Sequence, residues 1–149
     1  MTDSRAILVA EDDQNDALLL QCALAKTGLN GPVTVVHDGE EARNYLLGAG
    51  PYGDRTRYPL PGIMVVDLMM PRLGGFELLR WTRAQPELEH VFIVVLTGVE
   101  RRSWMEQAYK LGANLYLVKP LSFNELSGVI ACAAVAGTTM SSAGALTPA

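Results

Sequence analysis

Carboxylates, a hydroxyl and an ammonium group each follow directly after a short apolar run in this sequence. Apolar runs of this length, bounded by acids, Gly or Pro, are typical of strands that are buried on both faces. If these strands are parallel, their carboxyl ends meet at one edge of a sheet, and the polar residues converge there. These residues are Glu11 and Asp12 after the first run, Asp67 after the third run, Thr97 after the fourth run and Lys119 after the fifth run.

A cluster of this composition suits phosphoryl transfer. Two like charges about 4 Å apart repel by roughly 4 kcal/mol at an effective dielectric constant of 20, so neighbouring carboxylates favour a bound cation. Mg²⁺ prefers carboxylate, water and phosphoryl oxygens. Lys119 offers a positive charge to an anion, and Thr97 offers a hydroxyl. Catalysis of phosphoryl transfer is mostly positioning and charge neutralisation, and one carboxylate could be the nucleophile that forms an aspartyl-phosphate.

Each of these residues also has an ordinary structural explanation. An acidic pair after a strand often caps a helix, a lone Asp often lies in a turn, and Lys-Pro commonly follows a strand. The presence of all of them at successive strand ends of one short chain favours the functional interpretation.

The surrounding pattern alternates between the two periods of secondary structure. Strands are expected at 7–10, 33–36, 63–66, 92–96 and 115–118, and apolar residues with helical spacing lie between them. Asp13 can cap the first helix, and Ser122 with Glu125 forms a capping box for the last one. This alternation predicts an α/β fold with a doubly wound, five-stranded parallel sheet and helices on both faces. Three glycines lie where helices are expected to stop, namely Gly28, Gly48 and Gly112.

Four stretches and their spacing carry a family resemblance: ILVAEDD, MVVDLMMPRLGG, VVLTG and YLVKP. Over about residues 5–135 the chain resembles the receiver domain of bacterial two-component response regulators. The resemblance implies the flavodoxin-like strand order 2-1-3-4-5. We expect a receiver domain over residues 1–136 and a flexible or arm-like tail over residues 137–149.

The resemblance also implies a role for each residue of the cluster. Asp67 resembles the residue that accepts a phosphoryl group from the phosphohistidine of a sensor histidine kinase. Lys119 resembles the lysine that contacts the phosphoryl oxygens, and its bond to Pro120 is typically cis in the family. The expected Mg²⁺ ligands are Glu11, Asp12, Asp67 and the backbone carbonyl of Met69. Such a protein catalyses its own phosphoryl transfer and dephosphorylation but serves primarily as a signalling switch.

Thr97 and Tyr116 resemble the switch pair of the family. In that pair the threonine moves toward the phosphate and the aromatic ring turns inward. Tyr116 taken by itself would better suit a half-buried aromatic residue of a strand. Met69 and Val99 are apolar where they flank the path of the hydrolytic water, and our hypothesis is that this makes the phosphoryl group long-lived.

The sequence contains no recognisable effector segment, so we expect the receiver's own surface to provide the output. A segment rich in Pro, Gly and Arg covers residues 49–62 before the third expected strand. It resembles the single-domain regulators that are paired with bacterial phytochrome histidine kinases. An insertion of this length is equally compatible with a tolerated loop that has no role.

The last expected helix has no charged outer stripe, because no charged residue occurs from 126 to 149. A second copy of the chain is the simplest cover for such a helix. We therefore expect a homodimer through the surface formed by the segments 104–111, 115–118 and 123–136. The alternative is that alanine-rich faces tolerate exposure. Cys22 and Cys132, on the first and last helices, are expected to be buried, reduced thiols.

Composition excludes several other classes. Twelve basic and sixteen acidic residues give a net charge of −4, which argues against a nucleic-acid surface. No apolar run is long enough to cross a membrane, and the first residues lack a secretory signal, so we expect a cytoplasmic protein.

Three other functions share part of this pattern. A dehalogenase-type aspartyl phosphatase needs a second Asp at the position of Met69. A flavin carrier needs a phosphate loop where Glu11, Asp12 and Asp13 stand. A degenerate receiver that only binds partners would not need the intact acidic set and Lys119.

Overall fold

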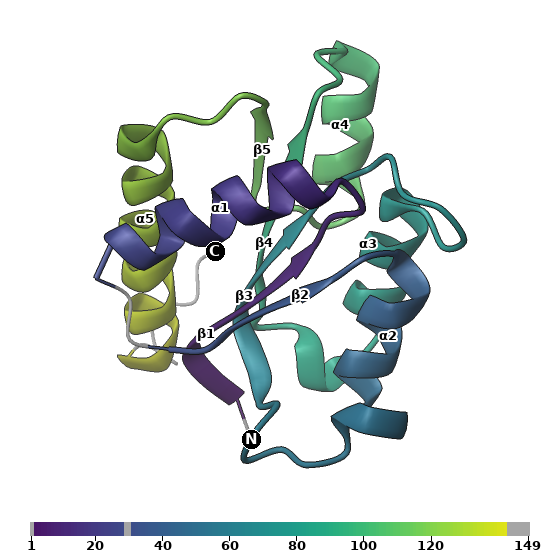
Figure 1. Ribbon diagram of the computed structural model, residues 1–149, viewed down its shortest axis with the longest axis vertical. Helices are drawn as coiled ribbons and strands as arrows, with labels where there is room; N and C mark the ends of the chain where they lie inside the picture. The colour runs from purple at the N-terminus through teal and green to yellow at the C-terminus, as the bar shows by residue number, and fades with distance from the viewer. Residues whose placement is uncertain (1, 29–30, 143–149) are drawn as a thin grey trace.

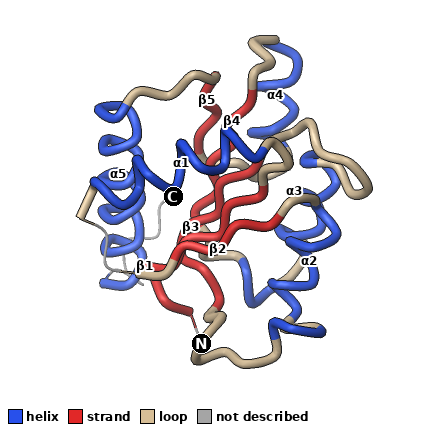
Figure 2. The backbone as a smooth tube through the Cα atoms, in the orientation of Figure 1, coloured by secondary structure: helices blue, strands red, loops and turns tan. Residues whose placement is uncertain are grey.

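The computed structural model describes residues 2–28 and 31–142. Strands form a central layer with helices on either side (Figures 1 and 2). The strands are β1 (Thr2–Ala10), β2 (Val33–Val36), β3 (Leu60–Val66), β4 (Phe92–Thr97) and β5 (Leu115–Val118). The helices are α1 (Gln14–Lys26), α2 (Gly39–Leu47), α3 (Gly75–Arg83), α4 (Arg102–Lys110) and α5 (Phe123–Ser142), with two short 3₁₀ turns at Gly50–Tyr52 and Pro86–Leu88.

The described strands form one parallel sheet in the order β2-β1-β3-β4-β5, which confirms the predicted fold class and strand order. All five predicted strands are present. β1 and β3 begin earlier than expected, at Thr2 and Leu60, so residues 60–62 belong to β3 rather than to the preceding insertion. In the register of β1 and β3, Ala10 is paired with Val66. The residues that follow these two strands, Glu11 and Asp67, are therefore neighbours.

Each face of the sheet carries its own core. Ile7 and Val9 of β1 face α1 and α5, whereas Leu8 and Ala10 face α2, α3 and α4. All four side chains are at most 1% exposed. A strand covered on both faces needs apolar residues at every position, which explains the unbroken apolar run in the sequence.

The helix-end signals act as predicted. The Asp13 carboxylate accepts a hydrogen bond of 2.9 Å from the backbone N–H of Asp16 and caps α1. Ser122 and Glu125 exchange two hydrogen bonds of 3.1 Å as a capping box before α5. Gly48 ends α2 at a φ of 68°, in the left-handed region that favours glycine.

The 49–62 segment is anchored to the end of α2. The Arg55 guanidinium donates hydrogen bonds of 2.8 Å to the backbone carbonyls of Tyr45 and Leu46. The rings of Tyr45, Tyr52 and Tyr58 pack against one another with centroids 5.1–5.9 Å apart. The segment therefore satisfies the last carbonyls of α2 and contributes to the core on that face.

The structure corrects the prediction for the two cysteines. Cys22 and Cys132 lie on α1 and α5 as expected, but both are exposed rather than buried. In α1 the buried residues Leu20 and Leu24 face the sheet. Cys22 is midway between them in sequence, and the helical period places it on the opposite side.

Helix α5 continues to Ser142, beyond the boundary that was expected between residues 136 and 137. The remaining residues of the predicted tail, 143–149, lie outside the described residues. No helix within the described ranges is long and apolar enough to cross a membrane.

Candidate functional site

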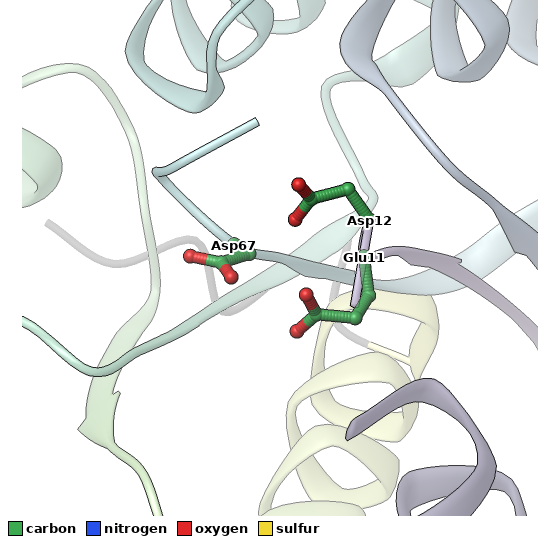
Figure 3. Close-up of side chains that lie close together, drawn as sticks. All are labelled: Glu11, Asp12 and Asp67. Atoms are coloured by element: carbon green, nitrogen blue, oxygen red, sulfur yellow. The ribbon is translucent and has the colours of Figure 1, made fainter. Parts of the chain in front are cut away.

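An acidic cluster lies at the carboxyl edge of the sheet (Figure 3). Glu11 and Asp12 come from the end of β1, and Asp67 comes from the end of β3. One carboxylate oxygen of each residue lies within 4.8 Å of those of the other two. Glu11 and Asp67 are buried, at 4% and 7% exposure, whereas Asp12 is exposed. This donor set of three convergent carboxylate oxygens fits Mg²⁺, which the sequence predicted.

Backbone contacts fix the positions of the two buried carboxylates. The N–H of Asp67 donates to the carbonyl of Ala10 at 3.0 Å, and the N–H of Glu11 donates to the carbonyl of Val36 at 3.0 Å. Helix α3 begins close behind Asp67: a Cβ added to Gly75 would lie 2.6 Å from the Asp67 carbonyl oxygen. Only glycine fits this approach, so Gly75 is needed for the helix to start there.

Lys119 closes the site from the loop after β5. Its Nζ lies 2.6 Å from Glu11 Oε1, 2.9 Å from Asp67 Oδ2 and 2.8 Å from Asp16 Oδ2. The sequence predicted Lys119 at this site but gave no signal for Asp16, which lies in the first turn of α1. The remaining oxygen of Asp67, Oδ1, accepts a 3.0 Å hydrogen bond from the backbone N–H of Met69.

The predicted ligand Met69 lies beside the cluster, with a side chain that is 58% exposed. Its place two residues after Asp67 is compatible with the contribution of a backbone carbonyl to a cation. The apolar side chain supplies no ligand atom of its own.

Burial dominates the electrostatics of the site. It raises the pKa of Glu11 from 4.5 to about 7, against the opposing hydrogen bond from Lys119. Burial alone would lower the pKa of Lys119, but hydrogen bonds to Asp16, Glu11 and Asp67 together raise it above the ordinary lysine value. Lys119 is therefore a permanent cation, and the buried carboxylate of Glu11 gains its charge near neutral pH.

The pKa of Glu11 predicts a pH dependence of cation binding. Mg²⁺ binds the ionised carboxylate, so its affinity should fall as the pH drops below 7, by up to about tenfold per pH unit. Without Mg²⁺, the stability of the fold changes with pH in the opposite direction to the Mg²⁺ affinity. The raised pKa of Glu11 stabilises the fold fully below pH 4.5, and this contribution is lost as the pH rises through 7.

Calorimetric titration with Mg²⁺ between about pH 6 and pH 8 tests this prediction. The control is Glu11→Gln, which should bind Mg²⁺ more weakly and without a transition near pH 7. An affinity of the unaltered protein that does not change over this range would contradict the role assigned to Glu11.

Thr97 and Tyr116 lie on the neighbouring strands β4 and β5. Thr97 is fully buried, and its hydroxyl oxygen accepts a 3.4 Å hydrogen bond from the N–H of Val99. The Tyr116 ring is buried, and its hydroxyl donates a 2.6 Å hydrogen bond to the Val99 carbonyl. Burial, and secondarily the negative charge of Asp67, raises the pKa of Tyr116. The 97–99 turn thus links the tyrosine to the strand end beside the site.

These residues stand in the order and at the strand ends that one known family requires. Residues 7–131 match the response regulator receiver domain. The chain belongs to this family. The predicted resemblance is confirmed.

Several response regulators are similar over most of their length. Rcp1 of Synechocystis is 29% identical over 122 residues, covering 82% of this chain and 81% of Rcp1. The Mn²⁺-bound form of Rcp1 has a TM-score of 0.72 at 27% identity, over 97% of this chain and 99% of that chain.

Two further solved structures are similar. The phosphorylated cyanobacterial phytochrome response regulator RcpA has a TM-score of 0.74 and 30% identity, covering 84% of this chain and 87% of RcpA. The bacteriophytochrome response regulator RtBRR has a TM-score of 0.75 and 35% identity, covering 85% of this chain and 75% of RtBRR. The receiver is therefore close to regulators associated with phytochromes.

Proposed function

We propose that this protein is a response regulator that accepts a phosphoryl group on Asp67 from a sensor histidine kinase. The observation that carries the proposal is the environment of the Asp67 carboxylate. It is buried, lies within the acidic cluster, and receives hydrogen bonds from Lys119 and from the backbone of Met69. A receiver relative, RcpA, has been solved in its phosphorylated form.

The proposed reaction uses the carboxylate as the nucleophile. An Asp67 oxygen attacks the phosphorus atom of the phosphohistidine, the new P–O bond forms as the P–N bond breaks, and the imidazole leaves. Negative charge moves from the Asp67 carboxylate to the phosphoryl oxygens, and the ammonium of Lys119 stabilises it in both places. Glu11, Asp12, Asp67 and the Met69 carbonyl would hold Mg²⁺, which neutralises phosphoryl charge when it is bound. A relative, Rcp1, has been solved in a Mn²⁺-bound form, which supports the proposal that this receiver binds a divalent cation.

The proposed output is a change of the α4-β5-α5 surface. A phosphoryl group on Asp67 offers a hydrogen-bond acceptor to the hydroxyl of Thr97. If Thr97 moves toward it, the 97–99 turn shifts, and with it the Val99 carbonyl that accepts the hydrogen bond from the Tyr116 hydroxyl. Tyr116 belongs to β5, an edge strand of the sheet. A local charge change thus reaches the surface through two adjacent strands.

We propose a phytochrome-type histidine kinase as the phosphoryl donor, since RcpA is a cyanobacterial phytochrome response regulator and RtBRR is a bacteriophytochrome response regulator. Transfer from a radiolabelled, autophosphorylated kinase of this type tests it, beside a kinase with another sensor. The expected result is faster labelling by the phytochrome-type kinase and no labelling of Asp67→Asn. No labelling from either kinase would leave a receiver fold that serves as an interaction module.

Dimerisation through the α4-β5-α5 surface makes a prediction for the two exposed cysteines. Cys132 lies on α5 inside this surface and Cys22 lies on α1 outside it. A short bismaleimide should cross-link two copies of Cys22→Ser through Cys132, and phosphorylation should change the yield. The matched variant Cys132→Ser should remain uncross-linked. Equal yields from both variants would contradict dimerisation through α5.

The apolar side chain of Met69 makes a prediction for the lifetime of the phosphoryl group. Met69 is 58% exposed beside Asp67 and cannot orient a water molecule by hydrogen bonding. Met69→Asn should shorten the half-life by about 10-fold, which is less than the roughly 10²–10⁴-fold effect of acid–base groups, because the amide adds a donor and an acceptor that orient water but transfers no proton. The decay of the phosphorylated protein, followed by intact mass after removal of the donor, measures it. An unchanged half-life would reject the hypothesis.

A further inference from the structure

The ammonium of Lys119 is fully engaged by three carboxylates. It has three N–H donors, and Glu11, Asp16 and Asp67 accept one hydrogen bond each at 2.6–2.9 Å. Two of these acceptors, Glu11 and Asp67, belong to the cluster that suits a cation. Asp16 lies outside this cluster, in the first turn of α1.

This difference decides which contact survives phosphoryl transfer. On the proposed function, the Glu11 carboxylate would hold Mg²⁺, and Asp67 loses its negative charge when the acyl phosphate forms. Only Asp16 then keeps a free carboxylate for Lys119. Its place is fixed by the start of α1, where its own N–H donates to the capping carboxylate of Asp13 at 2.9 Å.

We propose that Asp16 is a positioning residue for Lys119. The lysine stem has several rotatable bonds, and holding it in one geometry costs entropy. An ion pair to a carboxylate on a separate, rigid helix holds the ammonium beside Asp67 before and after the transfer, and leaves two N–H donors for phosphoryl oxygens. This inference rests on the proposed function.

The kinetic test compares phosphorylation by acetyl phosphate in Asp16→Ala, Asp16→Glu and the unaltered protein. Asp16→Ala should lower the maximal rate about fivefold, which is the size of a partly exposed ion pair of about 1 kcal/mol. Asp16→Glu should recover part of this rate. Asn15→Ala is the control, since Asn15 is exposed on the same turn of α1; it should keep the original rate.

The pattern of the kinetic change separates positioning from simple electrostatics. Loss of a negative charge alone would favour an anionic donor, lower its half-saturating concentration and leave the maximal rate unchanged. The proposal requires the reverse: a lower maximal rate with little change in the half-saturating concentrations of donor and Mg²⁺. A maximal rate of Asp16→Ala that is unchanged or increased would overturn it.

A second measurement does not depend on phosphorylation. In the absence of Mg²⁺, Asp16→Ala should lower the Tm in the original background, and this shift should be clearly smaller in the Lys119→Met background, where only the interaction of Asp16 with the helix dipole of α1 remains. Equal Tm shifts in both backgrounds would mean that Asp16 does not stabilise the protein through Lys119, which would overturn the proposal. If the unaltered protein is not phosphorylated at all, the proposed function fails, but this thermal cycle still reports on the contact of Asp16 with Lys119.

Discussion

Lys119→Met should slow phosphorylation of Asp67 by roughly 100-fold, which is the loss observed when one preorganised donor is removed from a site of charge development. Lys119 is the cation that contacts both Glu11 and Asp67. Methionine keeps most of the stem and removes the ammonium. The rate with acetyl phosphate at saturating Mg²⁺, followed by intact mass, measures the effect.

Lys119→Met should also make the stability of the protein depend on Mg²⁺. Without Mg²⁺, two buried carboxylates lose their counter-charge, which should cost about 2 kcal/mol, or roughly 5 °C in Tm. Mg²⁺ supplies the missing charge, so it should raise the Tm of Lys119→Met more than that of the unaltered protein. The control is Lys110→Met on α4, an exposed lysine that should leave both properties unchanged. A variant that is phosphorylated at the original rate would contradict the role of Lys119.

Arg83→Met should produce the largest loss of stability, about 3 kcal/mol, or roughly 6–12 °C in Tm. The Arg83 guanidinium uses its donors at the opposite edge of the sheet from the acidic cluster. They reach the carbonyls of Leu88, Glu89, Val91 and Gly112 and the side-chain oxygen of Asn114, at 2.8–3.2 Å. Arg83 thus ties the end of α3 to the segments that lead into β4 and β5.

The matched control for this prediction is Arg80→Met. Arg80 is on the same helix, is exposed, and makes no side-chain hydrogen bond within residues 2–28 and 31–142. It should shift the Tm by less than about 1 °C. Thermal unfolding followed by circular dichroism distinguishes the two variants. Equal Tm values of the two variants would contradict the role of Arg83 in tying α3 to the segments that lead into β4 and β5. Phosphorylation of the folded Arg83→Met protein should remain normal.

The sequence was sufficient to predict the fold because the signals are local. Apolar runs marked the strands, and capping residues such as Asp13 and Ser122 marked the helix starts. The cluster of Glu11, Asp12, Asp67, Thr97 and Lys119 followed from the fold, since parallel strands place their carboxyl ends together. The structure brings the three acids and Lys119 into contact or close proximity.

Contacts made by long side chains were not predictable in the same way. Asp16 lies in the first turn of α1 and Arg83 in the last turn of α3, where the helix dipole alone favours an acid and a base. Their partners lie 103 residues away, for Asp16, and up to 31 residues away, for Arg83. No local pattern marks a pairing of this kind. Cys22 was assigned to the core by residue type, although its helical phase relative to Leu20 and Leu24 places it outside.

The most direct test of phosphorylation at Asp67 is the intact mass of the protein after incubation with acetyl phosphate, with and without Mg²⁺. We expect the gain of one phosphoryl group that requires Mg²⁺ and is absent from Asp67→Asn. A gain of the same size in Asp67→Asn, or one that is independent of Mg²⁺, would contradict it.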